Sequence, residues 1–139
     1  MKKEPRGIRN NNPLNIRKGN NWKGEIKNQN DPSFEQFESM QMGLRAGFKL
    51  LSNYIKGGKS GAVRYNTLEK IIRRWAPPSE NATARYIDFV ATNAGISPMQ
   101  VLSFYDRPTM CQIVRAMAFV ENGQWIDMDL IKSAYDLSI

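Results

Sequence analysis

Glu121 is the acidic residue whose position is least explained by solubility. It falls on the apolar stripe that Met110 and Met117 mark in a predicted helix, just before Asn122-Gly123, a sequence typical of a helix end. Partial burial and the negative end of the helix dipole both disfavour a charged carboxylate, so we expect the pKa of Glu121 to be raised. A carboxylic acid that stays protonated near neutral pH is what a glycosidase uses to protonate a leaving oxygen. An ordinary Glu that turns out to water at a frayed helix end fits the same pattern.

Glu80 and Glu25 are the alternative candidates for a catalytic acid. Glu80 precedes Asn81 at the predicted start of a helix, where an acid favours the dipole and satisfies free N–H groups. A capping role therefore explains Glu80 better than catalysis does. Glu25 follows Trp22-Lys23-Gly24 in a polar segment, where it could face a ligand.

The chain has no histidine and a single cysteine, Cys111, which excludes several kinds of active site. Ser–His–Asp and Cys–His systems need an imidazole base, and zinc sites need clusters of His and Cys. Cys111 lies among apolar residues and is expected to fill the core. Asp127 and Asp129 have no further oxygen ligands nearby, so helix capping explains them, and we expect no metal and no cofactor. Carboxylate, lysine or tyrosine chemistry remains.

The first 28 residues carry eight Lys and Arg against two Glu, which is +6 of the net charge of +7. A basic segment on a nearly neutral body suggests an anionic polymer as partner, either nucleic acid or a bacterial wall with its acidic peptides. A solubilising terminus is the plain alternative. The segment is also rich in asparagine, and its residues Asn12, Asn15, Arg17 and Trp22 offer the amide hydrogen bonds and ring stacking that sugars accept.

Hydrophobic periodicity predicts a mainly α-helical protein that would position these side chains. At 139 residues the chain is long enough for one compact domain, with an irregular or short-hairpin segment over 1–38 and a helical body over 39–139. Start and stop signals predict six helices in the body, over about 40–56, 67–75, 81–94, 97–105, 109–121 and 128–137.

Three local features of these predicted helices can be compared directly with a structure. Asn66 and Glu69 are spaced as a capping box for the second helix. Gly95 is expected to end the third helix. In the first helix, Gly43 and Gly47 lie four residues apart and would let another backbone approach closely.

Five motifs, taken in order, resemble a known family of proteins. They are Asn11-Asn12-Pro13-Leu14-Asn15-Ile16-Arg17, Trp22-Lys23-Gly24, Phe34-x-x-Phe37, Gly43-Leu44-Arg45-Ala46 and Trp75-Ala76-Pro77-Pro78-x-Glu80-Asn81-x-Thr83. Together they resemble small lysozyme-like proteins of phages, prophages and conjugative elements, over about residues 6–125. The chain is also similar, more distantly, to flagellar-type glucosaminidases and lytic transglycosylases. In those enzymes a helix ending in Glu-Ser-Gly precedes the Asn-rich segment, whereas here the matching helix ends at Gly123, which suggests a circular permutation.

The resemblance implies a lysozyme-like helical domain with muramidase or lytic transglycosylase activity on the glycan strands of peptidoglycan. Glu121 would act as general acid and then as base, with help from the substrate's own acetamido group because no second acid is placed. The groove facing Glu121 would be lined by Asn12, Asn15, Arg17, Trp22 and Tyr86.

Two other functions remain open. One is a non-catalytic structural component of a virion or of conjugation machinery that holds glycan. The other is a nucleic-acid-binding module, which is less favoured because Arg73-Arg74 is the only basic pair on a predicted helix.

The sequence contains no run of eighteen apolar residues, and Met1-Lys2-Lys3 leads into polar residues. We therefore expect no transmembrane segment and no signal peptide. As written, the chain would remain in the cytoplasm, and it would act at the cell wall if it is exported or carried in a virion.

Overall fold

A computed structural model describes residues 4–57, 63–77 and 82–139 of the chain. Within these ranges it has six α-helices: α1 (Arg6–Arg9), α2 (Met40–Lys56), α3 (Leu68–Trp75), α4 (Thr83–Ala94), α5 (Arg107–Asn122) and α6 (Met128–Ser138). The predicted mainly α-helical fold is confirmed. In the predicted hairpin region the described residues form only two isolated antiparallel bridges, Arg17 with Phe34 and Glu25 with Phe37.

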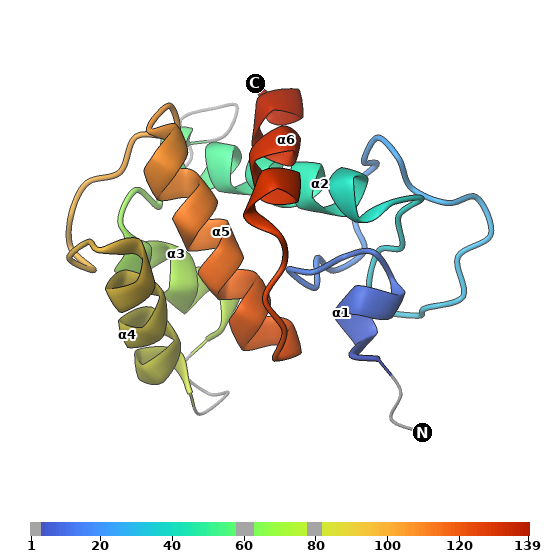
Figure 1. Cartoon of the computed structure of the whole chain (residues 1–139), viewed down its shortest axis with the longest axis horizontal. Helices are drawn as coiled ribbons and strands as arrows, with labels where there is room; N and C mark the ends of the chain where they lie inside the picture. Colours follow the sequence, from blue (N-terminus) through green and yellow to red (C-terminus); the bar gives the residue numbers. More distant parts are fainter. Residues whose placement is uncertain (1–3, 58–62, 78–81) are drawn as a thin grey trace.

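Helix α5 crosses the middle of the molecule, as Figure 1 shows. Helices α3 and α4 lie on one side of it, and the N-terminal segment with α1 lies on the other. Helix α6 crosses α2 and also contacts α5. The end of α5 therefore lies where the N-terminal segment meets the helical body.

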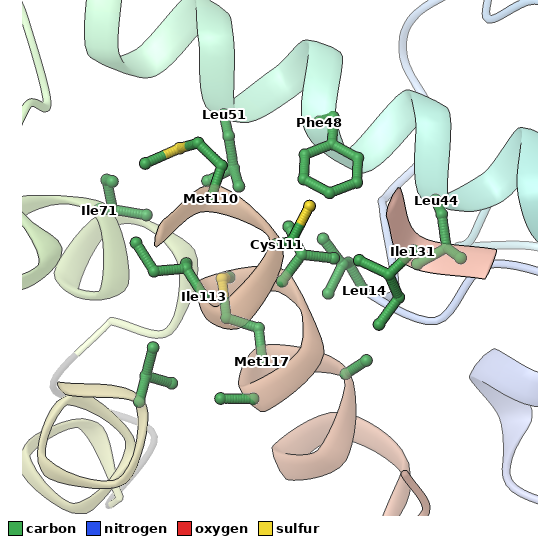
Figure 2. Packing of buried hydrophobic residues seen from close by; sticks show 14 of the residues in the cluster. Leu14, Leu44, Phe48, Leu51, Ile71, Met110, Cys111, Ile113, Met117 and Ile131 are labelled. Atoms are coloured by element: carbon green, nitrogen blue, oxygen red, sulfur yellow. The ribbon is translucent and has the colours of Figure 1, made fainter. Parts of the chain in front are cut away.

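The hydrophobic core is built around α5, whose apolar residues are buried over most of its circumference (Figure 2). Met110, Ile113 and Met117 of α5 are fully buried, and Phe48 of α2 packs edge-on against Tyr135 of α6, with ring centroids 5.4 Å apart. Cys111 is 1% exposed, which confirms the expected core role.

The N-terminal segment joins this core through Leu14, which is fully buried beside α2. Two glycines of α2 leave room for that approach. A Cβ at Gly43 would overlap the carbonyl oxygen of Asn11, and one at Gly47 would lie 2.6 Å from Leu14 Cδ1. The expected close backbone approach is therefore confirmed at Gly43, whereas at Gly47 the close neighbour is the side chain of Leu14.

The helix ends follow local chemistry, with one exception. The side chains of Ser39 and Thr67 accept hydrogen bonds from the N–H groups of the first turns of α2 and α3. Gly95 and Gly123 end α4 and α5 in the left-handed conformation, as expected. The predicted capping box is wrong, because Thr67 is the N-cap and Glu69 pairs instead with Arg73 at 3.1 Å.

The predicted helix over 97–105 is also wrong, because this segment forms turns that bond to a distant part of the chain. Ser97 accepts hydrogen bonds as a helix N-cap would, from the N–H groups of Met99 and Gln100. The Leu102 N–H, however, donates to the Asn66 carbonyl at 2.8 Å, and Pro98 accepts from the Glu69 N–H at 3.1 Å. Pairing with the start of α3 therefore replaces the hydrogen bonds within a helix.

A circular permutation is favoured when the chain ends lie close together. In Figure 1 the start of α1 and the end of α6 lie at opposite edges of the molecule. The two ends are therefore not adjacent, and their positions give no support to a permutation.

None of the described helices combines the length and apolarity that crossing a bilayer requires.

Candidate functional site

The carboxyl group of Glu121 lies at the C-terminal end of α5, held by two donors from distant parts of the chain. Asn15 Nδ2 donates to Oε1 at 2.8 Å, and the Tyr86 hydroxyl donates to Oε2 at 3.1 Å. Glu121 is half-buried, whereas Tyr86 is only 6% exposed. Burial, together with the charge and hydrogen bond of Glu121, raises the pKa of Tyr86 well above its ordinary value. Tyr86 therefore remains a hydroxyl donor at neutral pH and keeps the carboxyl group oriented.

The loop that carries Asn15 is organised around the fully buried side chain of Asn12. Asn12 Nδ2 donates to the Ile16 and Glu35 carbonyls, both at 3.0 Å, and Oδ1 accepts from the Ile16 N–H at 2.9 Å. Asn15 has a φ of 53°, a left-handed conformation that asparagine adopts more readily than most residues. Asn12 was expected to contact glycan, and this expectation is wrong because its side chain is buried and bonded within the loop.

The same loop is fastened to the end of α5 by Asn122. Asn122 Nδ2 donates to the Pro13 carbonyl at 2.7 Å and to the Ala118 carbonyl at 2.9 Å. On its other side, Asn122 Oδ1 meets Gly7 of α1, where a Cβ would overlap it and would lie 3.0 Å from Asn15 Oδ1. The Glu-Asn-Gly end of α5 thus places the carboxyl group, anchors the loop and ends the helix through three successive residues.

A cleft of about 450 Å³ opens between this loop and helices α2 and α3. Its lining combines amides, guanidinium groups and aromatic rings, which include Asn15, Arg17, Asn20, Tyr54, Arg74 and Trp75. Trp75 is half-buried; its Nε1 donates to the Leu14 carbonyl at 3.3 Å, and its ring lies edge-on to Tyr54 with centroids 5.8 Å apart. Such a surface suits a neutral polyhydroxylated chain, because rings stack on sugar faces and amides bond to hydroxyls. Asn15 contacts Glu121 and also lines the cleft.

The other binding residues expected from sequence are only partly brought together. Arg17 is exposed and lines the cleft, with its guanidinium 5.0 Å from the centre of the Phe34 ring. Tyr86 reaches Glu121 from a buried position, so it supports the acid rather than forming the groove wall. Trp22 is half-buried against the core and is not among the residues that line the cleft. Glu121 is likewise not among the described residues that line the cleft, and the arrangement of Trp22 across a groove from Glu121 stays a prediction.

Sequence reasoning missed the aromatic wall of the cleft. Trp75 fits the apolar stripe of its helix, a pattern that by itself predicts a core position. Tyr54 lies near the end of α2, and it becomes part of the cleft only because the loop that carries Asn15 and Arg17 forms the opposite wall. A tryptophan that directly follows Arg73-Arg74 in the last turn of a short helix was the available signal.

Glu25, one of the alternative acids, lies in a separate polar pocket of about 490 Å³ together with Glu35. Burial, followed by the hydrogen bond and charge of Glu25, raises the pKa of Glu35 to about 7. Burial also acts to raise the pKa of Glu25, but hydrogen bonds from the Trp22 N–H, Glu35 and Gln29 outweigh it and leave that pKa lowered. Glu35 was not identified from the sequence, because a charged residue that follows Phe34 in an alternating pattern is expected at the surface.

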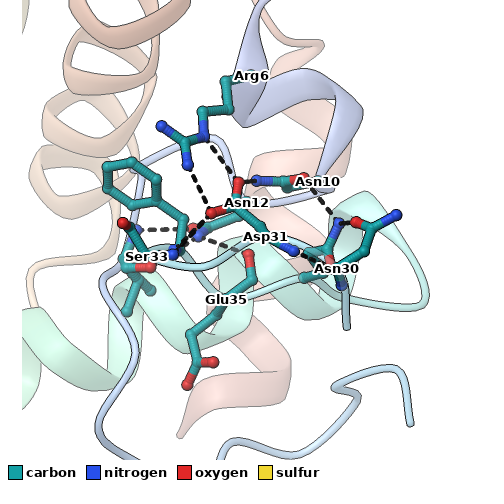
Figure 3. Close-up of polar contacts among 10 residues, drawn as sticks. Arg6, Asn10, Asn12, Asn30, Asp31, Ser33 and Glu35 are labelled. Atoms are coloured by element: carbon teal, nitrogen blue, oxygen red, sulfur yellow. Dashed lines mark hydrogen bonds and ion pairs between the residues drawn. The ribbon is translucent and has the colours of Figure 1, made fainter. Parts of the chain in front are cut away.

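A polar network centred on Asp31 shapes the segment that holds this pocket (Figure 3). Asp31 accepts from Arg6 Nε at 2.7 Å and Nη2 at 2.6 Å, from Asn10 Nδ2 at 2.9 Å, and from the N–H groups of Ser33 and Phe34 at 2.9 Å. These bonds, that of Arg6 foremost, hold the pKa of Asp31 well below its usual range although burial opposes them. One of the basic residues of the N-terminal segment is therefore paired internally.

Glu80, the remaining alternative acid, lies outside the described residues. Among the residues that the structure describes, no group of three or more His, Cys, Asp and Glu side chains is arranged to hold a metal ion.

Comparison with known proteins gives one informative match, while no protein-family model matches the chain. The sequence is 43% identical over 124 residues to Protein P5 of Pseudoalteromonas phage PM2, an overlap that covers 85% of this chain and 71% of that protein. At this identity and coverage the two share a fold. The chain therefore belongs to the family of Protein P5 of Pseudoalteromonas phage PM2.

Proposed function

We propose that this protein cleaves the glycan strands of peptidoglycan, as a muramidase or lytic transglycosylase, and serves cell-wall penetration by a phage or mobile element. The observation that carries the proposal is the position of Asn15, which bonds to Glu121 and also lines the aromatic and amide-rich cleft. Glu121 itself does not line the cleft, but it is one hydrogen bond away from a residue that does, and an oriented acid near a surface suited to sugars is the minimum that a glycosidase needs. Membership in a family with a phage protein fits a virion-borne enzyme that meets the host wall.

In this mechanism Glu121 donates its proton to the glycosidic oxygen as the bond from that oxygen to C1 breaks. The acetamido oxygen of the same sugar stabilises the positive charge that develops at C1, so a second protein carboxylate is not required. Glu121, now ionised, then takes a proton from the attacking group. That group is water in a hydrolase and the sugar's own C6 hydroxyl in a transglycosylase. That Glu121 is protonated in the free protein stays a prediction.

The surrounding side chains have separate roles in this proposal. Asn15 and Tyr86 orient the Glu121 carboxyl group through its two oxygens. Trp75 supplies an apolar face on which a sugar ring stacks. Arg17 supplies a positive charge for the acidic groups attached to the glycan.

The test uses purified peptidoglycan sacculi and mass analysis of the released muropeptides. The wild-type protein and Glu38→Gln, which changes an exposed acid outside both pockets, are expected to release soluble fragments. Glu121→Gln is expected to release none, because the amide keeps the shape but has no acidic proton. Anhydro products, lighter by one water than hydrolysed ones, would identify a transglycosylase.

Two alternative outcomes would redirect the assignment. Cleavage by Glu121→Gln at the wild-type rate would show that another acid acts, and Glu25→Gln and Glu80→Gln would then be tested in the same assay. Absence of cleavage by the folded wild-type protein would favour the non-catalytic role, in which the cleft only holds glycan. In that case Trp75→Ala, but not Glu121→Gln, would lose binding to sacculi in a sedimentation assay.

A nucleic-acid-binding role has less support. Arg6 of the basic segment is paired with Asp31, and Arg17 faces the cleft. A binding affinity for DNA that falls steeply as salt is raised would be needed to revive this alternative.

A further inference from the structure

The pocket that contains Glu25 and Glu35 presents oxygen atoms that the protein itself leaves without donors. Glu35 is only 2% exposed, yet its Oε2 has no hydrogen-bond donor among the described residues. Gln29 Nε2 donates to Glu25 Oε1 at 3.2 Å, and the other atom of this amide group, Oε1, is also buried without a donor. Burying such acceptors without a partner costs free energy.

The Glu25 carboxyl interacts with Glu35, but it cannot satisfy Glu35 when both acids are ionised. Glu25 Oε2 already accepts from the Trp22 N–H at 2.8 Å. A hydrogen bond between the two acids requires a proton on one of them, and burial places that proton on Glu35. In Figure 3 the Glu35 carboxyl points away from the Asp31 network. Glu35 is among the residues that line the pocket.

We propose that Glu25, Glu35 and Gln29 form a binding site for a hard divalent cation, best suited to Ca²⁺. Two carboxylates and an amide oxygen are ligand types that Ca²⁺ takes, and its flexible coordination admits a set completed by water. Gln29 would supply its oxygen by rotating the amide group that now donates to Glu25. Mg²⁺ demands a stricter octahedral arrangement and gives up its waters reluctantly, so it should bind more weakly in this irregular segment. The cation would replace the shared proton as the positive charge between the two acids.

Lys18 and Lys27 are the other charged residues that line the pocket. Both side chains are exposed, so their ammonium groups stay hydrated and can move aside when a cation enters. Their positive charge nevertheless weakens binding. Asn20 lines this pocket and the glycan cleft, so a bound cation would also stiffen the segment that borders the cleft.

The proposal predicts a pH-dependent affinity, because a cation and a proton compete for Glu35. With the pKa of Glu35 at about 7, the ionised fraction of this group rises about tenfold between pH 6 and pH 8. The Ca²⁺ affinity of the chain should therefore rise by about the same factor.

The experiment measures Ca²⁺ and Mg²⁺ binding by the metal-free 139-residue chain at constant ionic strength, by calorimetry and by the shift in melting temperature. Tb³⁺, a luminescent substitute for Ca²⁺, is added in parallel, since Trp22 lies next to Glu25 and can sensitise its emission. We expect Ca²⁺ to bind at pH 8, to bind about tenfold more weakly at pH 6, and to displace Tb³⁺. Glu35→Gln should abolish binding, and Glu38→Gln should leave it unchanged.

A second variant keeps the test decisive if Glu35→Gln fails to fold. Lys18→Gln removes an exposed positive charge near the pair and should tighten Ca²⁺ binding severalfold. The proposal is overturned if the wild-type chain shows neither a Ca²⁺-dependent rise in melting temperature nor Tb³⁺ emission at pH 8. It is also overturned if Lys18→Gln has no effect on affinity, or if folded Glu35→Gln binds as tightly as the wild-type chain.

Discussion

Asn15 is the residue whose substitution most directly tests the link between the N-terminal loop and Glu121. Its side chain contributes the 2.8 Å hydrogen bond to Glu121 Oε1, and its backbone holds a left-handed φ of 53°. Asn15→Ala removes the hydrogen bond and also places a residue that disfavours the left-handed conformation at this position. Asn15→Gly removes only the hydrogen bond, because glycine adopts that conformation readily. The two variants therefore separate the hydrogen bond from the backbone conformation.

The magnitudes follow from these two features. A hydrogen bond between neutral groups contributes about 0.5–1.5 kcal/mol and one to a charged group about 1.5–3 kcal/mol, so about 1.5 kcal/mol is expected for Asn15 and Glu121, which are both partly exposed. Alanine pays an additional ~1 kcal/mol in the left-handed conformation, which glycine adopts without steric cost. We therefore expect Asn15→Ala to lose roughly 2–3 kcal/mol of unfolding free energy and Asn15→Gly about 1 kcal/mol less than that.

The assay combines thermal unfolding followed by circular dichroism with the rate of muropeptide release from sacculi. A difference of ~1 kcal/mol corresponds to about 3–5 °C in a chain of this size, so the glycine variant should melt above the alanine variant by that amount. Cleavage should fall by about 10²-fold in both variants, because a misplaced acid loses its geometry with the substrate.

Two results would refute this account of Asn15. Equal melting temperatures for the glycine and alanine variants would show that the loop does not impose the left-handed conformation. Wild-type cleavage by both variants, under conditions where Glu121→Gln is inactive, would show that Asn15 does not position the acid.

Three further predictions concern the segment that supports the site. Gly43→Ala should destabilise the protein by about 1–3 kcal/mol in urea denaturation, because its Cβ meets a backbone carbonyl. Gly47→Ala meets the movable end of Leu14 and should stay within ~1 kcal/mol of wild type. Equal losses of unfolding free energy in the two variants would contradict the packing described. Folding lowers the pKa of Asp31, so the stabilisation that Asp31 provides is present above its ordinary pKa of 3.8 and is lost as the pH falls below that value. Asp31→Asn should therefore flatten the acid side of a plot of melting temperature against pH. An unchanged slope would count against the Asp31 network. Folding raises the pKa of Glu35 from 4.5 to about 7, so the folded state binds the proton more tightly than the unfolded state. Without added cation, the unfolding free energy should therefore fall as the pH rises across that interval. Glu35→Gln should remove this fall, and a fall that persists in the variant would mean that another group titrates.

Most of the helical body could be predicted from local signals. The apolar period from Met40, the glycines at 95 and 123, and Pro108 in the first turn of α5 place helix ends to within a few residues. The segment over 97–105 failed because its helix-start signals are outweighed by hydrogen bonds to residues 66 and 69, which no local pattern reveals. The single turn of α1 is too short to produce a hydrophobic period.

Composition and local periodicity were enough to predict the helical class, to exclude histidine and zinc chemistry, and to select Glu121 as the acid to test. These depend on composition and on periodicity along one helix, which are local properties. The surroundings of Glu121 depend on the folded chain, because Asn15 and Tyr86 lie 106 and 35 residues away along the sequence. Folding also buries Asn12 within its loop, places Trp75 in the cleft wall, and brings Glu25 and Glu35 together. Burial and pairing between distant segments set these roles, and both arise only when the whole chain has packed.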